Sequence, residues 1–180
     1  MIDRHRFFTA ARAGAFGGSM TQGQVDGCNF ILDTWEAHAD FTDKRWLAYM
    51  LATAKWETAH TMQPIEEYGK GEGQPYGVAV NGHAYYGRGY VQLTWATNYA
   101  RMAALTGVDL VGHPELALDP KIAALIMFEE MRGGLFTGVG LSTYFNAHAC
   151  DWVNARRIIN GLDRANEIAD IARAFNVAVS

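Results

Sequence analysis

Residues 43–60, which read DKRWLAYMLATAKWETAH, carry the apolar pattern from which the fold can be predicted. The apolar side chains recur three and four residues apart, at Trp46, Leu47, Met50, Leu51 and Ala54. That spacing places them on one face of an α-helix. Thr42 or Asp43 can cap its start, so the pattern predicts a core helix that runs to about His60.

The segments on both sides of this helix also follow the helical period. We expect further helices over residues 4–16, from Ser19 or Thr21 to Trp35, and over 95–105, 121–131, 151–159 and 163–178. Residues 64–89 break the pattern with seven glycines, two prolines and four tyrosines. A loop of this length inside a domain is usually either functional or disordered. Asn81-Gly82, between Ala79–Val80 and Tyr85–Tyr86, is consistent with a small hairpin.

These segments indicate one mainly α domain over residues 1–180. Its helical part spans 1–62 and 95–180, and a loop and hairpin lobe spans about 63–94. The 15 Lys and Arg against 19 Asp and Glu give a net charge of −4, which argues against a nucleic-acid-binding protein. Cys28 and Cys150 are too few for a disulfide framework or a four-cysteine zinc site.

The apolar runs 46–52 and 122–128 are too short to cross a bilayer, and the polar N-terminus lacks the apolar core of a secretory signal. We therefore expect a monomer that is made in the cytoplasm without stable membrane insertion. No pattern in the sequence calls for a metal or an organic cofactor.

Glu57 lies three residues after Ala54 and seven after Met50, so it shares the buried face in the last turn of the core helix. Desolvation and the unpaired carbonyls of the helix end both disfavour a carboxylate, so we expect its pKa to be raised. A carboxylic acid that keeps its proton near neutral pH can protonate the leaving oxygen of a glycosidic bond. The alternative is a solvated glutamate, or one that pairs with Lys55 or His60.

Glu66 and Glu67 follow where the core helix gives way to the loop. Two carboxyl groups that frame a cleft are the minimal equipment for glycoside hydrolysis. A short separation implies a nucleophile and retention of configuration, whereas a wider one leaves room for a water molecule and implies inversion. The alternative is a pair of solvated surface glutamates.

Residues 85–89, YYGRG, and 92–95, QLTW, place aromatic rings, a guanidinium, an amide and a hydroxyl close together. Sugar-binding clefts use this mixture, because flat rings stack on pyranose faces while polar groups bind the ring substituents. The alternative is a core of tyrosines and tryptophan around a structural arginine. Asn160-Gly161 by itself predicts only a helix end.

The stretch YYGRGYVQLT at 85–94, continued by Asn98-Tyr99, resembles the signature of family 19 glycoside hydrolases, which include plant-type chitinases and bacteriophage endolysins. Residues 51–58, LATAKWET, resemble the end of that family's catalytic helix, and 157–161, RIING, its late Ile-Asn-Gly element. The similarity keeps the same order over about residues 43–178.

The resemblance implies a lysozyme-like, two-lobed α-helical fold with the loop and hairpin beside a cleft. It also implies an inverting mechanism on β-1,4-linked N-acetylated sugars. Glu57 would be the general acid, Glu66 the base, with Glu67 as the near alternative, and Thr94 would hold the water. The residues expected to bind sugar or support the cleft are Glu67, Tyr86, Arg88, Gln92, Trp95, Asn98 and Asn160.

The chain also departs from the family's pattern. Trp56 replaces the usual histidine before the acid, and Arg164 is the candidate for a late arginine of the family. The long base-carrying loop and the disulfides of plant chitinases are missing. We therefore expect a compact endolysin-type enzyme that cleaves the glycan of peptidoglycan after release from the host cytoplasm. A chitinase, a lytic transglycosylase with one essential acid, and a non-catalytic glycan-binding module are the alternatives.

Overall fold

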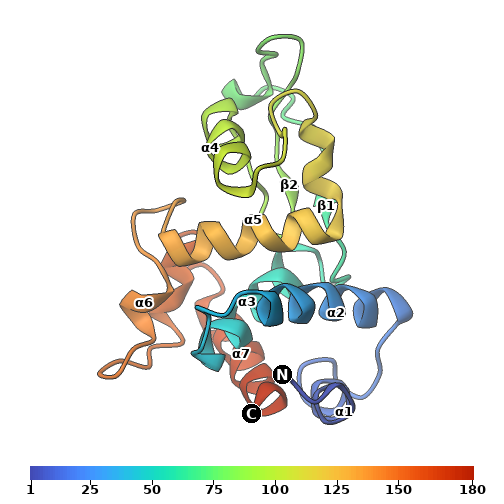
Figure 1. The fold of residues 1–180 in the computed structure, drawn as a ribbon, viewed down its shortest axis with the longest axis vertical. Helices are drawn as coiled ribbons and strands as arrows, with labels where there is room; N and C mark the ends of the chain where they lie inside the picture. The colour runs from blue at the N-terminus through green and yellow to red at the C-terminus, as the bar shows by residue number, and fades with distance from the viewer.

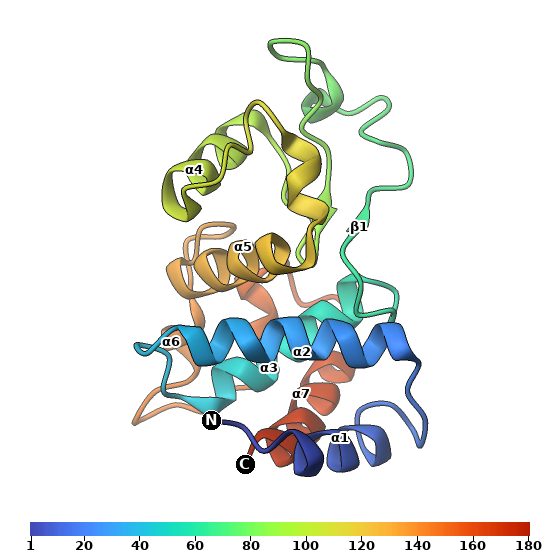
Figure 2. The ribbon, with the colours of Figure 1, turned by 45° about the vertical axis from the view of Figure 1, so that its right-hand side comes forward.

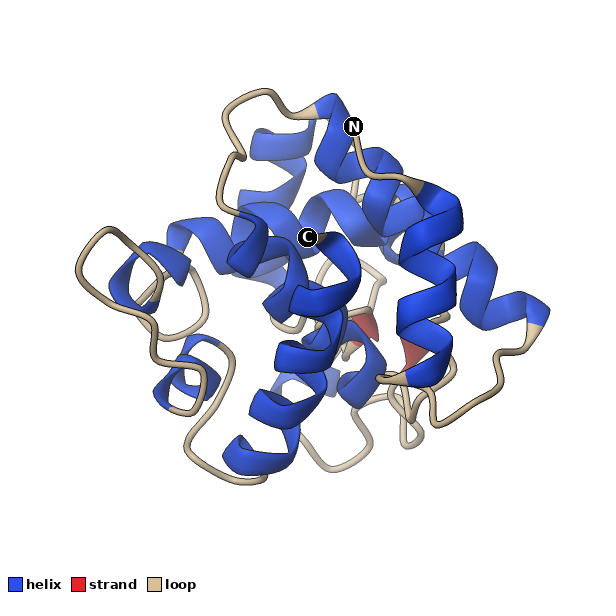
Figure 3. Cartoon of the chain, turned by 90° about the horizontal axis from the view of Figure 1, so that it is seen from below, coloured by secondary structure: helices blue, strands red, loops and turns tan.

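The computed structural model describes residues 1–180, and its central element is the expected core helix, α3 (Lys44–Glu57). Every side chain from Leu47 to Lys55 is buried, and the Asp43 carboxylate caps the start by accepting a hydrogen bond from the Arg45 backbone N–H at 3.0 Å. The C-terminal helix α7 (Ala165–Val179) packs along α3, and α1 (Arg4–Ala13) packs on α7. Figure 3 shows the C-terminal helix in the middle of this helical layer.

Helix α3 ends at Glu57, earlier than the expected end near His60. The Thr58 hydroxyl donates to the Ala54 carbonyl at 2.7 Å. Ala59 and His60 then adopt left-handed backbone angles, with φ of 49° and 68°. Because two successive residues leave the right-handed helical region, the helix cannot continue, and Glu57 becomes its last residue.

Helix α2 (Gln22–Ala37) begins at Thr21 with a capping box, in which Thr21 and Gln24 exchange hydrogen bonds between side chain and backbone. Helix α5 (Pro120–Gly133) begins at Asp119, whose carboxylate accepts from two backbone N–H groups. Helix α4 (Ala96–Thr106) lies close to its predicted bounds. The starts of α2 and α5 follow local sequence signals, so the sequence predicted them well, whereas α4 begins after Trp95 without a side-chain cap.

Other expected elements differ from the structure. Residues 151–159 form only a short 3₁₀ turn, η3 (Asn154–Ile158), and the four-residue helix α6 (Leu141–Tyr144) was not expected. A second 3₁₀ turn, η2 (Pro114–Leu118), precedes α5. Helix α1 ends at Ala13, because the chain turns at Gly14.

The ends of the glycine-rich segment form a two-stranded antiparallel sheet that the sequence did not predict. Strand β1 (Ile65–Glu66) pairs with β2 (Arg88–Gly89), and Glu66 lies opposite Arg88. The hairpin predicted around Asn81-Gly82 forms only as a single antiparallel bridge between Val80 and His83, and it does not extend to Tyr85 or Tyr86. The 3₁₀ turn η1 (Pro75–Gly77) lies in the loop between the strands, where the Gly71 carbonyl occupies the place of a Gly77 side chain.

The elements form two lobes, as the resemblance implied. Helices α1, α2, α3 and α7 lie below α5, whereas α4, the sheet and the glycine-rich loop lie above it (Figures 1 and 2). The segment that carries Glu66 descends from the loop toward the end of α3 (Figure 2). One continuous apolar cluster includes Leu47 and Met50 of α3 together with Tyr85 and Leu93 beside the sheet. None of the helices combines the length and apolar character that crossing a bilayer requires.

Helix α2 comes so close to the turn after α3 that one added methyl group is expected to lower the free energy of unfolding. A Cβ added at Gly27 would collide with the Met62 carbonyl, whereas a Cβ at Gly23 would lie 3.7 Å from the Gln63 side chain. We expect Gly27→Ala to lower the free energy of unfolding by about 1–3 kcal/mol through overpacking. Gly23→Ala in the same helix should leave it unchanged or raise it by about 0.5–1 kcal/mol. Urea denaturation measures both, and equal effects would contradict the described packing.

Candidate active site

Glu57 ends α3 with its carboxylate against a buried arginine. Its Oε1 accepts a hydrogen bond from Nη1 of Arg156 at 2.6 Å, and the two side chains are 20% and 5% exposed. Nε of Arg156 also donates to the Asp163 carbonyl at 3.3 Å, which holds the guanidinium from another side. The alternative partners Lys55 and His60 contact each other instead, with 2.5 Å between Nζ and Nδ1.

This ion pair is a contact that the sequence analysis did not predict. Arg156 is the arginine that reaches Glu57, whereas Arg164, the candidate for the late arginine of the family, forms a surface pair with Glu167 at 3.1 Å. A guanidinium within hydrogen-bonding distance stabilises a carboxylate. The sequence-based argument for a retained proton on Glu57 did not include this interaction.

Glu66 on β1 is held by two partners from the glycine-rich lobe. Its Oε2 accepts from the Tyr86 hydroxyl at 3.0 Å, and its Oε1 lies 2.9 Å from Nζ of Lys70. The hydrogen bond from Lys70, followed by that from Tyr86, lowers the pKa of Glu66 below its usual value. The lowered pKa keeps Glu66 ionised. Because its side chain is 39% exposed, water can reach the carboxylate.

Glu67 has a different environment from Glu66. Its Oε1 accepts from the Tyr76 hydroxyl at 2.9 Å, and its Oε2 accepts from the Gly87 backbone N–H at 3.1 Å. Both carboxylate oxygens of Glu67 therefore hold parts of the loop together, while the carboxylate of Glu66 makes no hydrogen bond to the backbone.

Arg88 lies beneath Tyr86 rather than facing solvent. Its guanidinium stacks 3.6 Å from the centre of the Tyr86 ring, and its Nη1 donates to the Tyr99 hydroxyl at 3.0 Å. The Tyr99 hydroxyl in turn donates to the Tyr86 carbonyl at 2.9 Å. Arg88 is buried and stacks on Tyr86. It therefore holds the tyrosine whose hydroxyl orients Glu66.

Gln92 connects the two strands. Its Nε2 donates to the Ile65 carbonyl at 3.1 Å and to the Gly89 carbonyl at 3.3 Å. A Cβ at Gly87 would lie 2.7 Å from Gln92 Oε1, so the glycine makes room for this amide. In the structure, the amide of Gln92 therefore orders the strand that carries Glu66.

The start of α4 supplies the other residues expected from the signature. Thr94 and Asn98 are half-buried, and their side chains make no hydrogen bond within the protein. Trp95 is 46% exposed and packs edge to face on Tyr76, with ring centres 5.5 Å apart. These three side chains are thus free to contact a ligand.

The predicted residues fall into separate groups. Glu66, Glu67, Tyr86, Arg88 and Gln92 gather around the two-stranded sheet, Glu57 pairs with Arg156, and no hydrogen bond joins Glu57 to Glu66. Asn160 lies in the exposed turn after η3.

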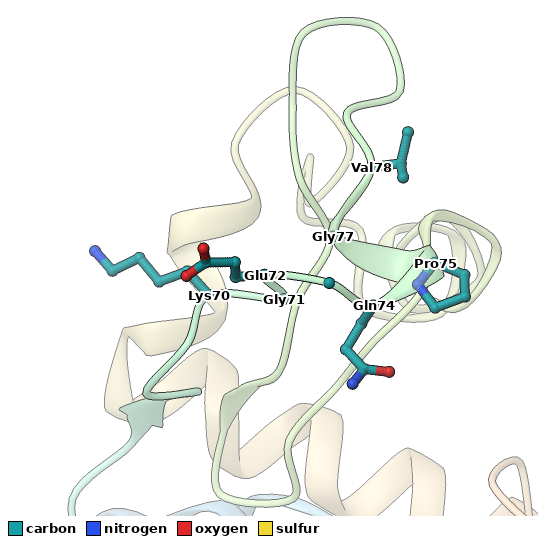
Figure 4. A pocket seen from close by; sticks show the side chains of 8 residues that line it. Lys70, Gly71, Glu72, Gln74, Pro75, Gly77 and Val78 are labelled. Atoms are coloured by element: carbon teal, nitrogen blue, oxygen red, sulfur yellow. The ribbon is translucent and has the colours of Figure 1, made fainter.

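Three cavities open on the surface, and neither Glu57 nor Glu66 lines one. A cavity of about 500 Å³ is formed by the loop from Lys70 to Val78 (Figure 4). A cavity of about 440 Å³ includes Asn160, and a third lies between Met1 and Phe41.

Sequence reasoning missed Arg156, Lys70 and Tyr76. Lys70 follows Glu66 by four residues, a spacing that indicates an ion pair in a helix. The sequence predicted a loop here, so this signal was not used. Arg156 is separated from Glu57 by 99 residues, and no local pattern joins them.

Comparison with known proteins assigns the family. A family model described as class I chitinase matches residues 34–130, more than half of the chain. Endochitinase 1 of Theobroma cacao is 49% identical over 43 residues, and endochitinase A2 of Pisum sativum is 46% identical over 44 residues. These matches cover 23% and 24% of this chain but only 13% and 14% of the curated relatives.

Solved structures share the fold over nearly the whole chain. Chitinase C from Streptomyces griseus HUT6037 superposes with a TM-score of 0.68 at 19% identity, over 98% of this chain and 76% of that one. A bacterial family 19 chitinase described as differing from plant enzymes superposes with a TM-score of 0.62 at 19% identity, over 99% and 95%. With the family model matched over more than half of its residues, this chain belongs to family 19 of the glycoside hydrolases, the class I chitinase family.

Proposed function

We propose that this protein hydrolyses β-1,4 bonds between N-acetylated sugars with inversion, using Glu57 as general acid and Glu66 as general base. The observation that carries the proposal is the half-buried Glu57 carboxylate, held by a buried arginine at the end of the core helix. Membership of family 19 supports the reaction class.

Arg156 has a defined part in this mechanism. Glu57 becomes a carboxylate when it gives its proton to the leaving oxygen, and the adjacent guanidinium stabilises that charge. The arginine is itself almost fully buried and bonded to the Asp163 carbonyl, so it also fixes the direction of the Glu57 carboxyl group. A positioned acid needs no reorientation when the sugar chain arrives.

Glu66 is suited to activate water. Lys70 and Tyr86 keep it ionised and oriented, and its partial exposure leaves room for a water molecule. Thr94, whose hydroxyl has no protein partner, is proposed to hold that water. Inversion needs two carboxyl groups separated by roughly 6.5–9.5 Å. The separate partners of Glu57 and Glu66 support this arrangement over a shared, closely spaced pair.

For the substrate we propose the glycan strands of peptidoglycan, with chitin oligomers as the alternative that shares every catalytic residue. The net charge of −4 offers no long-range attraction to an anionic wall, so recognition rests on contacts in the site. Trp95 and Asn98 are proposed to contribute such contacts, the first by stacking and the second by hydrogen bonding.

Removal of the acid tests the reaction class. Wild-type protein should release hydrolysed fragments from purified peptidoglycan or from chitin oligomers, as identified by mass spectrometry. Glu57→Gln should lose at least about a hundredfold in rate, because an amide cannot donate the proton. Circular dichroism should show that the variant is folded. Folded wild type that leaves both substrates intact would contradict the proposal.

Substitution of the two neighbouring glutamates tests the base. Glu66→Gln should lower the rate by about 10²–10⁴-fold, the usual contribution of a positioned acid or base. Glu67→Gln should lose less than about tenfold, because an amide oxygen can still accept from Tyr76 or Gly87. Full activity of Glu66→Gln with anhydro-sugar products would indicate a lytic transglycosylase instead.

The pH profile tests the contact between Lys70 and Glu66. The base must be ionised, and Lys70 lowers its pKa, so activity persists at acidic pH and is lost as the pH falls through that value. Lys70→Met should move the acidic limb of kcat/KM to higher pH. Lys121→Met, an exposed lysine at the start of α5 that forms no salt bridge, is the matched control and should leave the limb in place. Coinciding profiles for Lys70→Met and wild type would rule out this role.

A further inference from the structure

A cavity lined by Arg157, the residue that follows Arg156, combines a positive charge without a salt bridge with hydrogen-bonding groups. It has a volume of about 440 Å³ and is lined by Thr137, Val139, Tyr144, Arg157, Ile159, Asn160 and Gly161. This volume lies within the range of about 300–1,000 Å³ typical of small-molecule sites. The lining residues come from α6, from η3 and the turn after it, and from the loop that follows α5. Figure 1 shows α6 beside one end of α5.

Arg157 gives the cavity its charge. It is exposed, forms no salt bridge, and is the one charged residue in the lining. The other cavities differ, because Lys70 and Glu72 both line the one formed by the glycine-rich loop, and Glu36 in the third is paired with Arg4. The cavity at Arg157 is therefore the one with an uncompensated positive charge.

The other lining groups offer hydrogen bonds and small apolar surfaces. The Tyr144 hydroxyl and the Asn160 Nδ2 make no hydrogen bond within the protein, since Asn160 uses only its Oδ1, which accepts from Gly161 N–H at 2.8 Å. Val139 and Ile159 provide apolar walls. Free donors beside aliphatic walls suit the carbonyl and the methyl of an acetamido group.

A hydrogen bond ties two sides of the cavity together, and the cavity adjoins the residue that contacts the proposed acid. The Thr137 hydroxyl donates to the Arg157 carbonyl at 2.7 Å, which ties the loop after α5 to η3. Arg156, the preceding residue, binds Glu57 at 2.6 Å. A sugar in this cavity would therefore lie on the segment that positions the acid.

We propose that this cavity is a binding subsite for an N-acetylated sugar that carries a carboxylate, and that Arg157 binds that carboxylate. The inference rests on the proposed function and deepens it, because it assigns the substrate to an anionic glycan rather than neutral chitin. In peptidoglycan, the carboxylate belongs either to the lactyl ether of the muramic residue or to the attached peptide. Both place the negative charge on the substituent of the sugar, where a guanidinium can bind it bidentately.

Binding measurements test the proposed carboxylate-binding subsite without requiring catalysis. With Glu57→Gln protein, calorimetry compares a peptide-free tetrasaccharide of alternating N-acetylglucosamine and N-acetylmuramic acid, its methyl ester, the peptide-bearing form, and N-acetylglucosamine tetrasaccharide. We expect at least about tenfold tighter binding of a free-carboxylate glycan than of the ester and the neutral oligomer, which corresponds to about 1.4 kcal/mol. The peptide-free and peptide-bearing arms show which carboxylate is bound.

Arginine substitutions test whether Arg157 is the residue that causes the preference for a free carboxylate. Arg157→Gln should remove the preference for the carboxylate, and Arg157→Lys should restore part of it, since it returns the charge without the planar fork. Arg12→Gln removes the same charge from an exposed arginine at the end of α1 and should leave the preference intact. The preference should also weaken in high salt.

The two proposals fail in different ways. Equal binding of free acid, ester and neutral oligomer, or a preference that Arg157→Gln leaves unchanged, would overturn this inference even if the wild type cleaves chitin oligomers. Carboxylate-dependent binding by a protein that hydrolyses neither glycan would uphold the subsite and overturn the hydrolase proposal.

Discussion

The ion pair between Glu57 and Arg156 is the contact on which the candidate site depends. It joins the end of the most buried helix to a short 3₁₀ turn 99 residues later in the chain, and it brings a charged group from each to the boundary of the core. A partly buried carboxylate without a partner would bear an uncompensated desolvation cost. The pair therefore explains both how Glu57 is tolerated at this depth and why its direction is fixed.

The second carboxylate is organised by a separate set of contacts. Glu66 lies on a two-residue strand, and such a short strand has little stability of its own. Gln92 binds the backbone of both strands, and the ring of Tyr86, supported by Arg88, carries the hydroxyl that orients Glu66. Tyr86, Arg88 and Gln92, which the resemblance implied would either bind sugar or support the cleft, make in the structure the contacts that hold the proposed base.

Arg157 is the residue that we propose binds a substituent of the substrate. Arg156 and Arg157 are neighbours in η3, yet one is buried against an acid and the other is exposed in a cavity without any acid. A tight turn separates adjacent side chains in this way, because each residue advances by about a third of a turn. One short segment thereby contacts the proposed acid on one side and a proposed anionic substituent on the other.

The sequence by itself determined the helices whose signals are local: the apolar stripe of α3, the caps at Thr21, Asp43 and Asp119, and the placement of Glu57 at a helix end. It also carried the family resemblance in residues 85–94, within the range that the family model matches.

The tertiary structure alone decided which charges meet. The contact of Glu66 with Tyr86, the pairing of β1 with β2, and the ion pair between Glu57 and Arg156 all join segments that no helical or strand period relates. Periodicity reports which face of an element is buried, but it holds no information about which distant element covers that face. For that reason the fold class could be read from the sequence, and the partners of the two carboxylates could not.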